Sequence, residues 1–510
     1  MANFDPGVLT DRLQLALQQP VASHLWHQLY LSAAAAPAAA RQALLASVRA
    51  HAPTGGPGGF LAATFRHAVS DDVADLAAAS RAAVGSRLPV DAGLALLHLI
   101  YARALGSGGS ADGYAALLRA SGFLDVALHL GQTVAQRAGP EWRRSTTGHR
   151  PLQRVAVVTP TLSGALHAPT DMVLRHAGLL LQSGLEVSVF AAQEFQMLDM
   201  EHWLGVPTRM NIDSAQPDAW PQPRRALTIK LAAPALSMGA RWNSLLQEIK
   251  RFEPDAVFFI GPYSPLIFAL YQRYPLVGLG SNTLAPVGPL DVWLAPQAQS
   301  QATWAPHFAI GRNVVYSNRF NVKAAPQARS RALLGLPESA MLWVTTGTRL
   351  HHEISPAWRD AVLAALERKP DCHWLLVGVA QEQLGGWPAQ HPRVHLRGFD
   401  DDLPSLLKDC SLYLNPPRLG GGHSVVCAMA HGLPVLALRG SDGGDKLGAW
   451  AQSDEQGYFV ALDQLGADTA AQRQLGEHLR QRYLETLELS AGASTLLAAL
   501  QDAAAGKAAP

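Results

Sequence analysis

A short unit between Cys410 and Leu438 restricts the fold of this chain more than any other stretch. It reads CSLYLNPPRLGGGHSVVCAMAHGLPVLAL and contains two apolar runs, 410–414 and 434–438, with the length and composition of buried strands. Between them lie three successive glycines, Gly420 to Gly422, and a segment, 424–431, whose apolar residues recur at helical spacing. The order strand, glycine loop, helix, strand predicts one crossover unit of a parallel sheet.

The glycine loop of this unit is a candidate anion site. Glycines remove the side chains that would keep a ligand away from the backbone, and the helix start directs free amides at that ligand. We therefore expect Gly421, Gly422, His423 and Ser424 to hold a diphosphate, with Asn415 and Pro416 shaping the loop entrance. The alternative is a turn that needs glycine only for its backbone dihedrals.

The same alternation of apolar strands and helices begins abruptly at Arg154 and continues through most of the chain. Strands are expected at RVAVVTP, LEVSVFAA, DAVFFIG, PLVGLG and DVWLAP, and a second run opens with NVVYS near Asn313, followed by MLWVTTG, HWLLVGV and VHLRG. Two such runs predict two doubly wound Rossmann-like domains with a ligand cleft between them. We place them at residues 151–318 and 319–500, with C-terminal helices in the second domain and a disordered tail at 501–510.

Residues 1–150 differ from the rest in being Ala- and Leu-rich without a convincing strand. Apolar residues share helical faces, for example Leu25, Trp26, Leu29 and Tyr30. The fold class predicted for the whole chain is therefore α/β, with an all-helical N-terminal domain followed by two parallel-sheet domains.

Composition excludes several classes of function. The chain has 510 residues, of which 48% are hydrophobic and 16% charged, and a net charge of +1, so nothing favours nucleic acid or a polybasic membrane anchor. No apolar run approaches about 18 residues, which argues against a membrane span. The three cysteines, Cys372, Cys410 and Cys427, lack metal-binding spacing and lie in or beside apolar stretches. A cytoplasmic location with reduced thiols is expected.

Taken together, these stretches resemble the GT-B glycosyltransferases, which use nucleotide sugars. The segment from VHLRG to PVLAL looks like their donor half, including Gly432-Leu433-Pro434 after the phosphate helix. Within that superfamily the chain resembles the O-GlcNAc transferase family (glycosyltransferase family 41) and its bacterial cytoplasmic N-glycosyltransferases. The resemblance rests on LHAPTDM, on RYPLVGLGSNTLAPVGPLDVWLAP and on NPPRLGGGHSVV.

The resemblance implies roles for particular residues. LHAPTDM places His167 where the family has a transfer-site histidine, as general base or as a hydrogen-bond partner of the donor; the alternative is that it only caps the following helix. Pro275 and Asp291 fall on the family's proline and aspartate. Gln381 follows a strand at the edge where the family reads uracil and ribose, although a plain loop glutamine is equally compatible.

Two departures from the family pattern concern the donor site. Cys427 stands where the family has an aspartate that holds the ribose hydroxyls, and neither Leu419 nor Cys427 supplies the glutamates of retaining relatives. The family's phosphate lysine has no counterpart in VTTGTRLHHEISP, where Arg349 is the nearest cation and His352 the next candidate.

The function expected from this combination is an inverting, metal-independent transfer of a hexose from a nucleotide diphosphate sugar, such as UDP-glucose, to an Asn or Ser/Thr side chain. His167 and Arg349 are the expected catalytic residues, and the donor is a substrate, with no further cofactor. A protein acceptor such as an adhesin or flagellin fits the helical domain, and a homo-oligomer is left open. The alternatives are a glycan- or lipid-directed GT-B enzyme and an inactive GT-B scaffold or partner protein.

Overall fold

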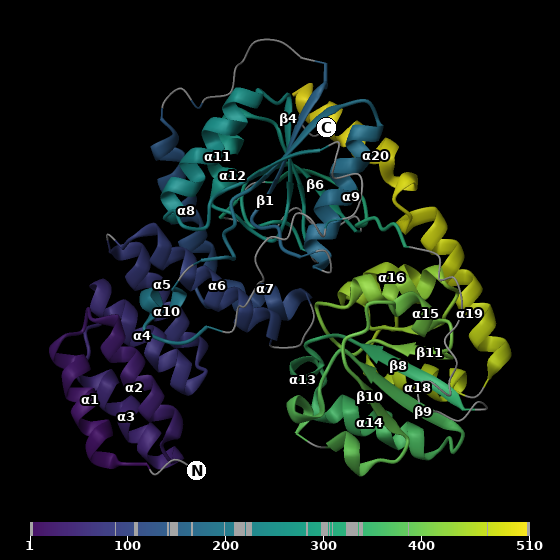
Figure 1. Ribbon diagram of the computed structural model, residues 1–510, viewed down its shortest axis with the longest axis horizontal. Helices are drawn as coiled ribbons and strands as arrows, with labels where there is room; N and C mark the ends of the chain where they lie inside the picture. Colours follow the sequence, from purple (N-terminus) through teal and green to yellow (C-terminus); the bar gives the residue numbers. More distant parts are fainter. Residues whose placement is uncertain are drawn as a thin grey trace.

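The structure of the protein is a computed structural model (Figure 1). It describes residues 4–86, 88–106, 111–139, 142, 151–164, 167–197, 199–208, 220, 227–281, 284–296, 304, 307–308, 310–322, 335, 340–385, 387–466 and 468–506. Within these residues the predicted class is confirmed, because a helical N-terminal region precedes two parallel sheets.

The N-terminal region consists of helices in the part that is described. Alanine and leucine favour helix here, and Asp5 and Asp72 cap two of the starts by accepting from Gly7 N and Ala74 N. The helices are α1 Pro6–Gln18, α2 Ser23–Ala35, α3 Ala38–His51, α4 Gly56–Ser70, α5 Val73–Gly85, α6 Val90–Gly106, α7 Ala111–Ala120 and α8 Phe123–Ala138.

The first sheet has seven parallel strands in the order β3-β2-β1-β4-β5-β6-β7. The strands are β1 Arg154–Thr159, β2 Glu186–Ala191, β3 Thr228–Leu231, β4 Ala256–Ile260, β5 Leu276–Leu279, β6 Leu290–Ala295 and β7 Ile310–Val315; the helices are α9 Ala168–Gln182, α10 Met200–Leu204, α11 Met238–Phe252 and α12 Leu266–Arg273. The NVVYS segment was expected to open the second sheet. That prediction is wrong, because β7 pairs with β6 as an edge of the first sheet.

The second sheet has five parallel strands in the order β10-β9-β8-β11-β12. The strands are β8 Met341–Thr346, β9 Cys372–Val377, β10 Val394–Arg397, β11 Leu412–Leu414 and β12 Val435–Leu436; the α-helices are α13 Leu350–Glu353, α14 Pro356–Glu367, α15 Leu403–Leu407, α16 Gly422–Ala430, α17 Asp442–Leu447, α18 Glu455–Leu465 and α19 Thr469–Arg482. The strand order in each sheet reverses beside its first strand, which is where doubly wound folds bind ligands.

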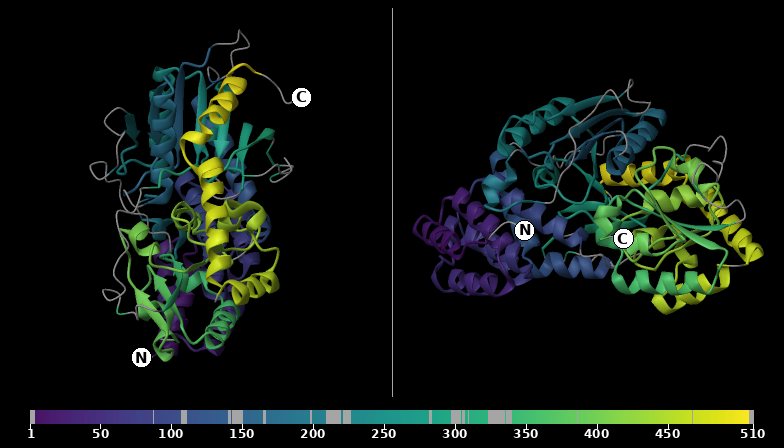
Figure 2. Two further views of the ribbon diagram at one scale, coloured as in Figure 1. Left: turned by 90° about the vertical axis from the view of Figure 1, so that its right-hand side faces the viewer. Right: turned by 60° about the horizontal axis from the view of Figure 1, so that its bottom comes forward.

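The last helix, α20 Ala493–Ala504, leaves the second sheet and returns to the first. Its buried Leu496, Ala499 and Leu500 share a core with the first sheet, and the chain crosses between the two sheets along one side of the molecule (Figure 2). The C-terminal helices therefore divide between the sheets instead of all covering the second. Residues 501–504, expected to be disordered, continue α20, whereas 507–510 lie outside the described residues.

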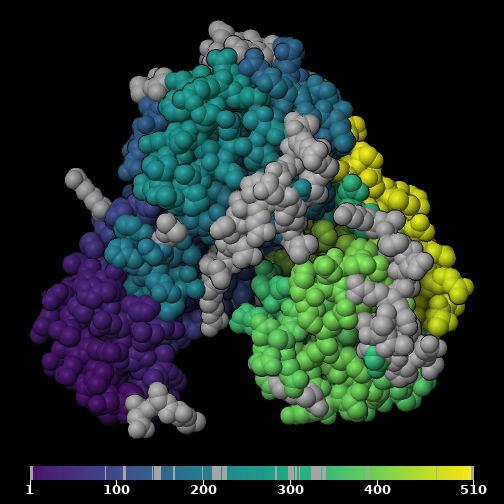
Figure 3. Space-filling view, viewed as in Figure 1, coloured from purple at the N-terminus to yellow at the C-terminus, as the bar shows by residue number. Residues whose placement is uncertain are grey.

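The helical region and the first sheet are joined by one continuous apolar core. Helix α8 packs so tightly on α12 that a Cβ at Gly131 would lie 2.2 Å from the Phe268 ring. The second sheet has separate cores of its own, and in the space-filling view it forms a lobe distinct from the helical region (Figure 3). No helix of the described residues is both long and apolar enough to cross a bilayer.

Candidate active site

The glycine loop lies between β11 and α16, at the carboxyl edge of the second sheet. Gly421 occupies the N-cap position of α16 with a φ of 84°, in the left-handed region that favours glycine. Gly422 begins the helix, and His423 and Ser424 follow in its first turn. The predicted strand–loop–helix–strand unit is therefore present.

Charged side chains approach each of the three glycines. A Cβ at Gly420 would lie 2.5 Å from Arg349 Nη2, one at Gly421 2.2 Å from Arg418 Nη2, and one at Gly422 2.2 Å from Asp442 Oδ2. The positive φ of Gly421 supports the turn interpretation of this loop. The glycines admit charged groups to the loop backbone, and one of those groups is the predicted cation, Arg349.

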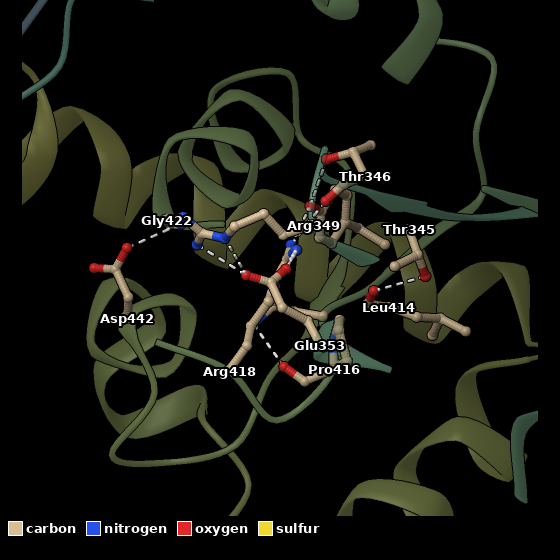
Figure 4. Close-up of polar contacts among 11 residues, drawn as sticks. Thr345, Thr346, Arg349, Glu353, Leu414, Pro416, Arg418, Gly422 and Asp442 are labelled. Atoms are coloured by element: carbon tan, nitrogen blue, oxygen red, sulfur yellow. Dashed lines mark hydrogen bonds and ion pairs between the residues drawn. The ribbon is translucent and has the colours of Figure 1, made fainter. Parts of the chain in front are cut away.

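Glu353 connects Arg349 to a second arginine that the sequence analysis missed (Figure 4). Glu353 Oε1 accepts from Arg349 Nε at 3.1 Å and Nη2 at 2.8 Å, and Oε2 accepts from Arg418 Nη1 at 2.7 Å. The side chains of Glu353 and Arg418 are only 4% and 1% exposed, whereas that of Arg349 is 49% exposed. Glu353 therefore directs a solvent-accessible cation over the glycine loop.

Arg418 is anchored by further contacts beneath the loop. Its guanidinium donates to Asn415 Oδ1 at 2.9 Å and to the Thr346 carbonyl at 2.8 Å, so it ties the end of β8 to the loop. Burial alone would raise the pKa of Glu353, but the Arg418 and Arg349 guanidiniums outweigh it and hold that pKa below its usual value. The cluster therefore carries a net positive charge at neutral pH, and its excess charge is on the accessible Arg349.

Asp442 occupies one backbone donor of the predicted anion site. Its Oδ2 accepts from Gly422 N at 3.0 Å (Figure 4). Lys446 Nζ lies 3.2 Å from Oδ1. Both come from α17, and the Lys446 side chain is only 6% exposed. This pair was not predicted from the sequence, although DGGDK places an acid and a lysine four residues apart just after β12.

His423 faces the first sheet's helix α9. Its ring lies 5.8 Å from the Phe320 ring, which in turn stacks under the Arg175 guanidinium at 4.7 Å. Although the residue is solvent-accessible, desolvation by the surrounding protein lowers the pKa of His423; Arg175 contributes in the same direction and Asp171 opposes it. The start of α16 and the first turns of α9 therefore lie close together. Ser424 is half-buried beside them.

His167 is in the N-cap position of α9, but its side chain makes no capping hydrogen bond to the helix amides. Its Nδ1 lies 2.9 Å from the Thr170 hydroxyl, which accepts from Ser163 N at 2.8 Å. Asp171, in the first turn of α9, forms an ion pair with Arg175 at 2.8 Å. The ring of His167 is therefore oriented by a hydroxyl at the carboxyl edge of the first sheet.

Three other residues named from the sequence lie in different surroundings. Cys427 is buried within α16, and burial raises the pKa of its thiol to about 12, so it stays protonated. Gln381 is exposed at the start of a 3₁₀ helix, Gln381–Leu384, beyond the carboxyl end of β9. Asp291 accepts from Leu276 N at 2.7 Å where β5 and β6 begin, on the opposite edge from the candidate site. Among the described residues, no cluster of three or more His, Cys, Asp or Glu side chains could hold a metal ion.

Part of the second lobe matches a known protein family. Residues 351–473 match the family model described as glycosyl transferases group 1, which includes Glu353, the glycine loop and Asp442. A mutant of Thermobaculum terrenum O-GlcNAc transferase aligns over 100% of both chains, with 14% identity and a TM-score of 0.53. The chain has the GT-B glycosyltransferase fold. The predicted resemblance to GT-B enzymes of the O-GlcNAc transferase type is confirmed.

Two further solved structures align with about two thirds of the chain. Anabaena HepE in complex with UDP-glucose covers 68% of this chain and 100% of its own, with 16% identity and a TM-score of 0.47. A glycosyltransferase from Rickettsia africae covers 69% and 99%, with 12% identity and a TM-score of 0.48. No curated protein sequence matches the chain. At these identities and TM-scores the two structures indicate nothing about the substrates of this chain, which depend on its own residues.

Proposed function

We propose that the protein transfers a hexose from a nucleotide diphosphate sugar to a protein side chain, with inversion and without a metal ion. The observation that carries the proposal is the half-exposed Arg349 guanidinium, which Glu353 holds over the glycine loop at the start of α16. A cation fixed beside helix-terminal amides can stabilise an anion whose negative charge increases during the reaction.

In the proposed reaction, the bond between the anomeric carbon and the diphosphate oxygen breaks, and its electron pair leaves with the diphosphate. Arg349 and the amides of the first turn of α16 stabilise that charge. The acceptor oxygen or nitrogen bonds to the opposite face of the anomeric carbon, which inverts the configuration. Its proton passes to His167, whose other ring nitrogen is oriented by Thr170.

The nature of the acceptor atom limits what His167 can contribute. A Ser or Thr hydroxyl can transfer its proton to imidazole as the new bond forms. An amide nitrogen is a much weaker nucleophile, so with an Asn acceptor His167 would serve mainly to orient the donor. Comparing Ser/Thr peptides with Asn peptides therefore also distinguishes these two roles.

The proposed function is tested by incubating the purified protein with UDP-glucose and a library of Asn- and Ser/Thr-containing peptides, without added metal and with EDTA. We expect peptide products that are heavier by one hexose, together with stoichiometric UDP. Glycosylation of a glycan or lipid acceptor but no peptide would favour the glycan- or lipid-directed alternative. UDP binding with no turnover on any acceptor would favour the inactive scaffold.

A further inference from the structure

Helix α16 receives its N-terminal cap from a distant part of the chain. Gly421 at the N-cap position has no side chain with which to accept from the helix amides, a role that Ser, Thr, Asp and Asn usually fill. Asp442 supplies the missing acceptor from 20 residues further on, through its contact with Gly422 N. An anion therefore already occupies the helix end at which the proposed donor diphosphate would bind.

The backbone that carries Asp442 is held in place. A Cβ at Gly443 would lie 2.6 Å from Asn415 Nδ2, and one at Gly444 would lie 1.9 Å from the Leu438 carbonyl oxygen. Ser441 caps α17 by accepting from Gly444 N at 2.9 Å. A rearrangement at the helix end must therefore come from rotation of the Asp442 side chain, because α17 has no room to shift toward β12.

Lys446 gives this carboxylate a partner that can also serve a phosphate. Its ammonium is 3.2 Å from Asp442 Oδ1 and 6.0 Å from the centre of the Phe320 ring, the same ring that packs against His423. The ammonium is almost fully buried, so its charge is poorly screened by solvent. The Phe320 ring therefore lies near both the ammonium and His423, which is in the first turn of α16.

We propose that the Asp442 carboxylate occupies the phosphate subsite when no donor is bound and is displaced when the donor binds. Lys446 pairs with Asp442 in the first state and with the donor diphosphate in the second. This inference rests on the proposed function. Without a donor, the carboxylate satisfies Gly422 N and Lys446. When a diphosphate binds, the carboxylate rotates away, and the diphosphate accepts from the Gly422 amide and from the ammonium. Lys446 thereby supplies the phosphate-binding lysine that is absent from the Arg349 segment.

The test is calorimetric titration of the full chain with two probes, UDP and inorganic pyrophosphate. Asp442→Asn keeps an oxygen for Gly422 N but removes the competing charge, so both probes should bind about tenfold more tightly. Lys446→Met removes the ammonium and should weaken both by about tenfold or more, whereas Lys446→Arg should retain binding. The control is Asp463→Asn, since Asp463 pairs with Arg368 on an exposed surface and should leave both affinities unchanged.

The possible outcomes separate this inference from the proposed function. If the wild type binds UDP and Asp442→Asn fails to tighten pyrophosphate, the displacement idea is wrong while the proposed function stands. If Asp442→Asn weakens UDP but not pyrophosphate, Asp442 instead contacts the nucleoside, and the inference is again wrong. If no variant, including a correctly folded Asp442→Asn, binds either probe, both proposals fail. Thermal melting of each variant verifies that it is folded.

Discussion

Glu353 accepts a hydrogen bond of 2.7 Å from Arg418 while both side chains are almost completely withdrawn from solvent. A buried ion pair of this kind is costly to break from one side, because the remaining charge loses both its partner and its water. Three backbone or side-chain groups besides Glu353 hold Arg418 under the glycine loop. The pair is therefore a structural support on which the accessible Arg349 depends.

Replacing Glu353 with Gln should destabilise the protein by about 3 kcal/mol at neutral pH. Because the pKa of Glu353 is held below its usual value, its contribution to stability is present above pH 4.5 and is lost as the pH falls through the lowered pKa. The difference between wild type and variant in urea unfolding should therefore shrink in acid. Glu367→Gln, at an exposed acid paired with His391, is the control; an equal loss there would contradict the burial argument.

Replacing Arg349 with Ala should lower turnover by roughly 100-fold at saturating donor, the effect of removing one preorganised charge-stabilising group. Stability should change by less than about 1 kcal/mol, since half of the side chain is exposed. Initial rates with UDP-glucose and chemical denaturation measure the two effects. Arg368→Ala, which breaks an exposed ion pair elsewhere in the same lobe, should leave turnover unchanged. Wild-type turnover of Arg349→Ala would remove this residue from the site, and His352 would be tested next.

Two glycines with similar backbone angles should respond very differently to substitution by Ala. Gly421 and Gly440 have φ values of 84° and 77°, but a Cβ at Gly421 would collide with Arg418, whereas a Cβ at Gly440 would meet nothing within 4 Å. We expect Gly440→Ala to cost about 1 kcal/mol of backbone strain and Gly421→Ala roughly 2 kcal/mol more. Urea unfolding of the pair measures the difference. Equal costs would mean that Arg418 can move aside freely.

Replacing His167 with Asn should leave the melting temperature near that of the wild type while most transfer activity is lost. Asparagine is a good N-cap residue, so it can support the start of α9, but it lacks the imidazole. UDP affinity should fall little, since the proposed diphosphate contacts lie in the other lobe. A parallel Thr170→Val variant, which loses the hydroxyl next to His167, should reduce activity in the same direction. Full activity of His167→Asn would make the histidine merely structural.

Glu194 should make the folded protein less stable as the pH rises. It is fully buried beside β2, accepts from Ser264 and Trp242, and burial raises its pKa to about 8. When the pKa of an acid is raised in the folded state, its contribution to folding stability is fully present below pH 4.5 and is progressively lost as the pH rises to 8. Glu194→Gln should therefore gain stability relative to the wild type over that range, on the order of 4 kcal/mol. Thermal unfolding at pH 5 and pH 8 provides the comparison, and parallel behaviour of the two proteins would contradict the raised pKa.

The sequence predicts the two sheets well because strands of a parallel sheet are buried on both faces and therefore appear as continuous apolar runs. Every residue of Ala256–Ile260, for example, is buried. The glycine loop could also be predicted, because the strand before it and the helix after it distinguish it from an ordinary turn. The edge strand β7 was assigned to the wrong sheet, since a strand's own residues do not specify its neighbour.

The polar support of the site could not be predicted in the same way. Glu353 and Arg418 are separated by 65 residues, and neither differs in the sequence from an ordinary surface charge. Asp442 lies in a loop whose path back to Gly422 depends on the packing of Gly443 and Gly444. These contacts depend on tertiary geometry, which local spacing in the sequence does not specify.

The return of α20 to the first sheet affects how this chain can be made. Strands β1 to β7 leave the ribosome early, but a face of their sheet is covered by Leu496, Ala499 and Leu500, which are synthesised last. Domains commonly fold in order during synthesis, each as its own segment is completed. In this chain the lobe that is translated first can complete its fold only after the last helix has been synthesised. A chain that stops before residue 493 would leave an apolar face of its first lobe open to water, although residues 351–473, which match the glycosyl transferases group 1 model, would already be synthesised.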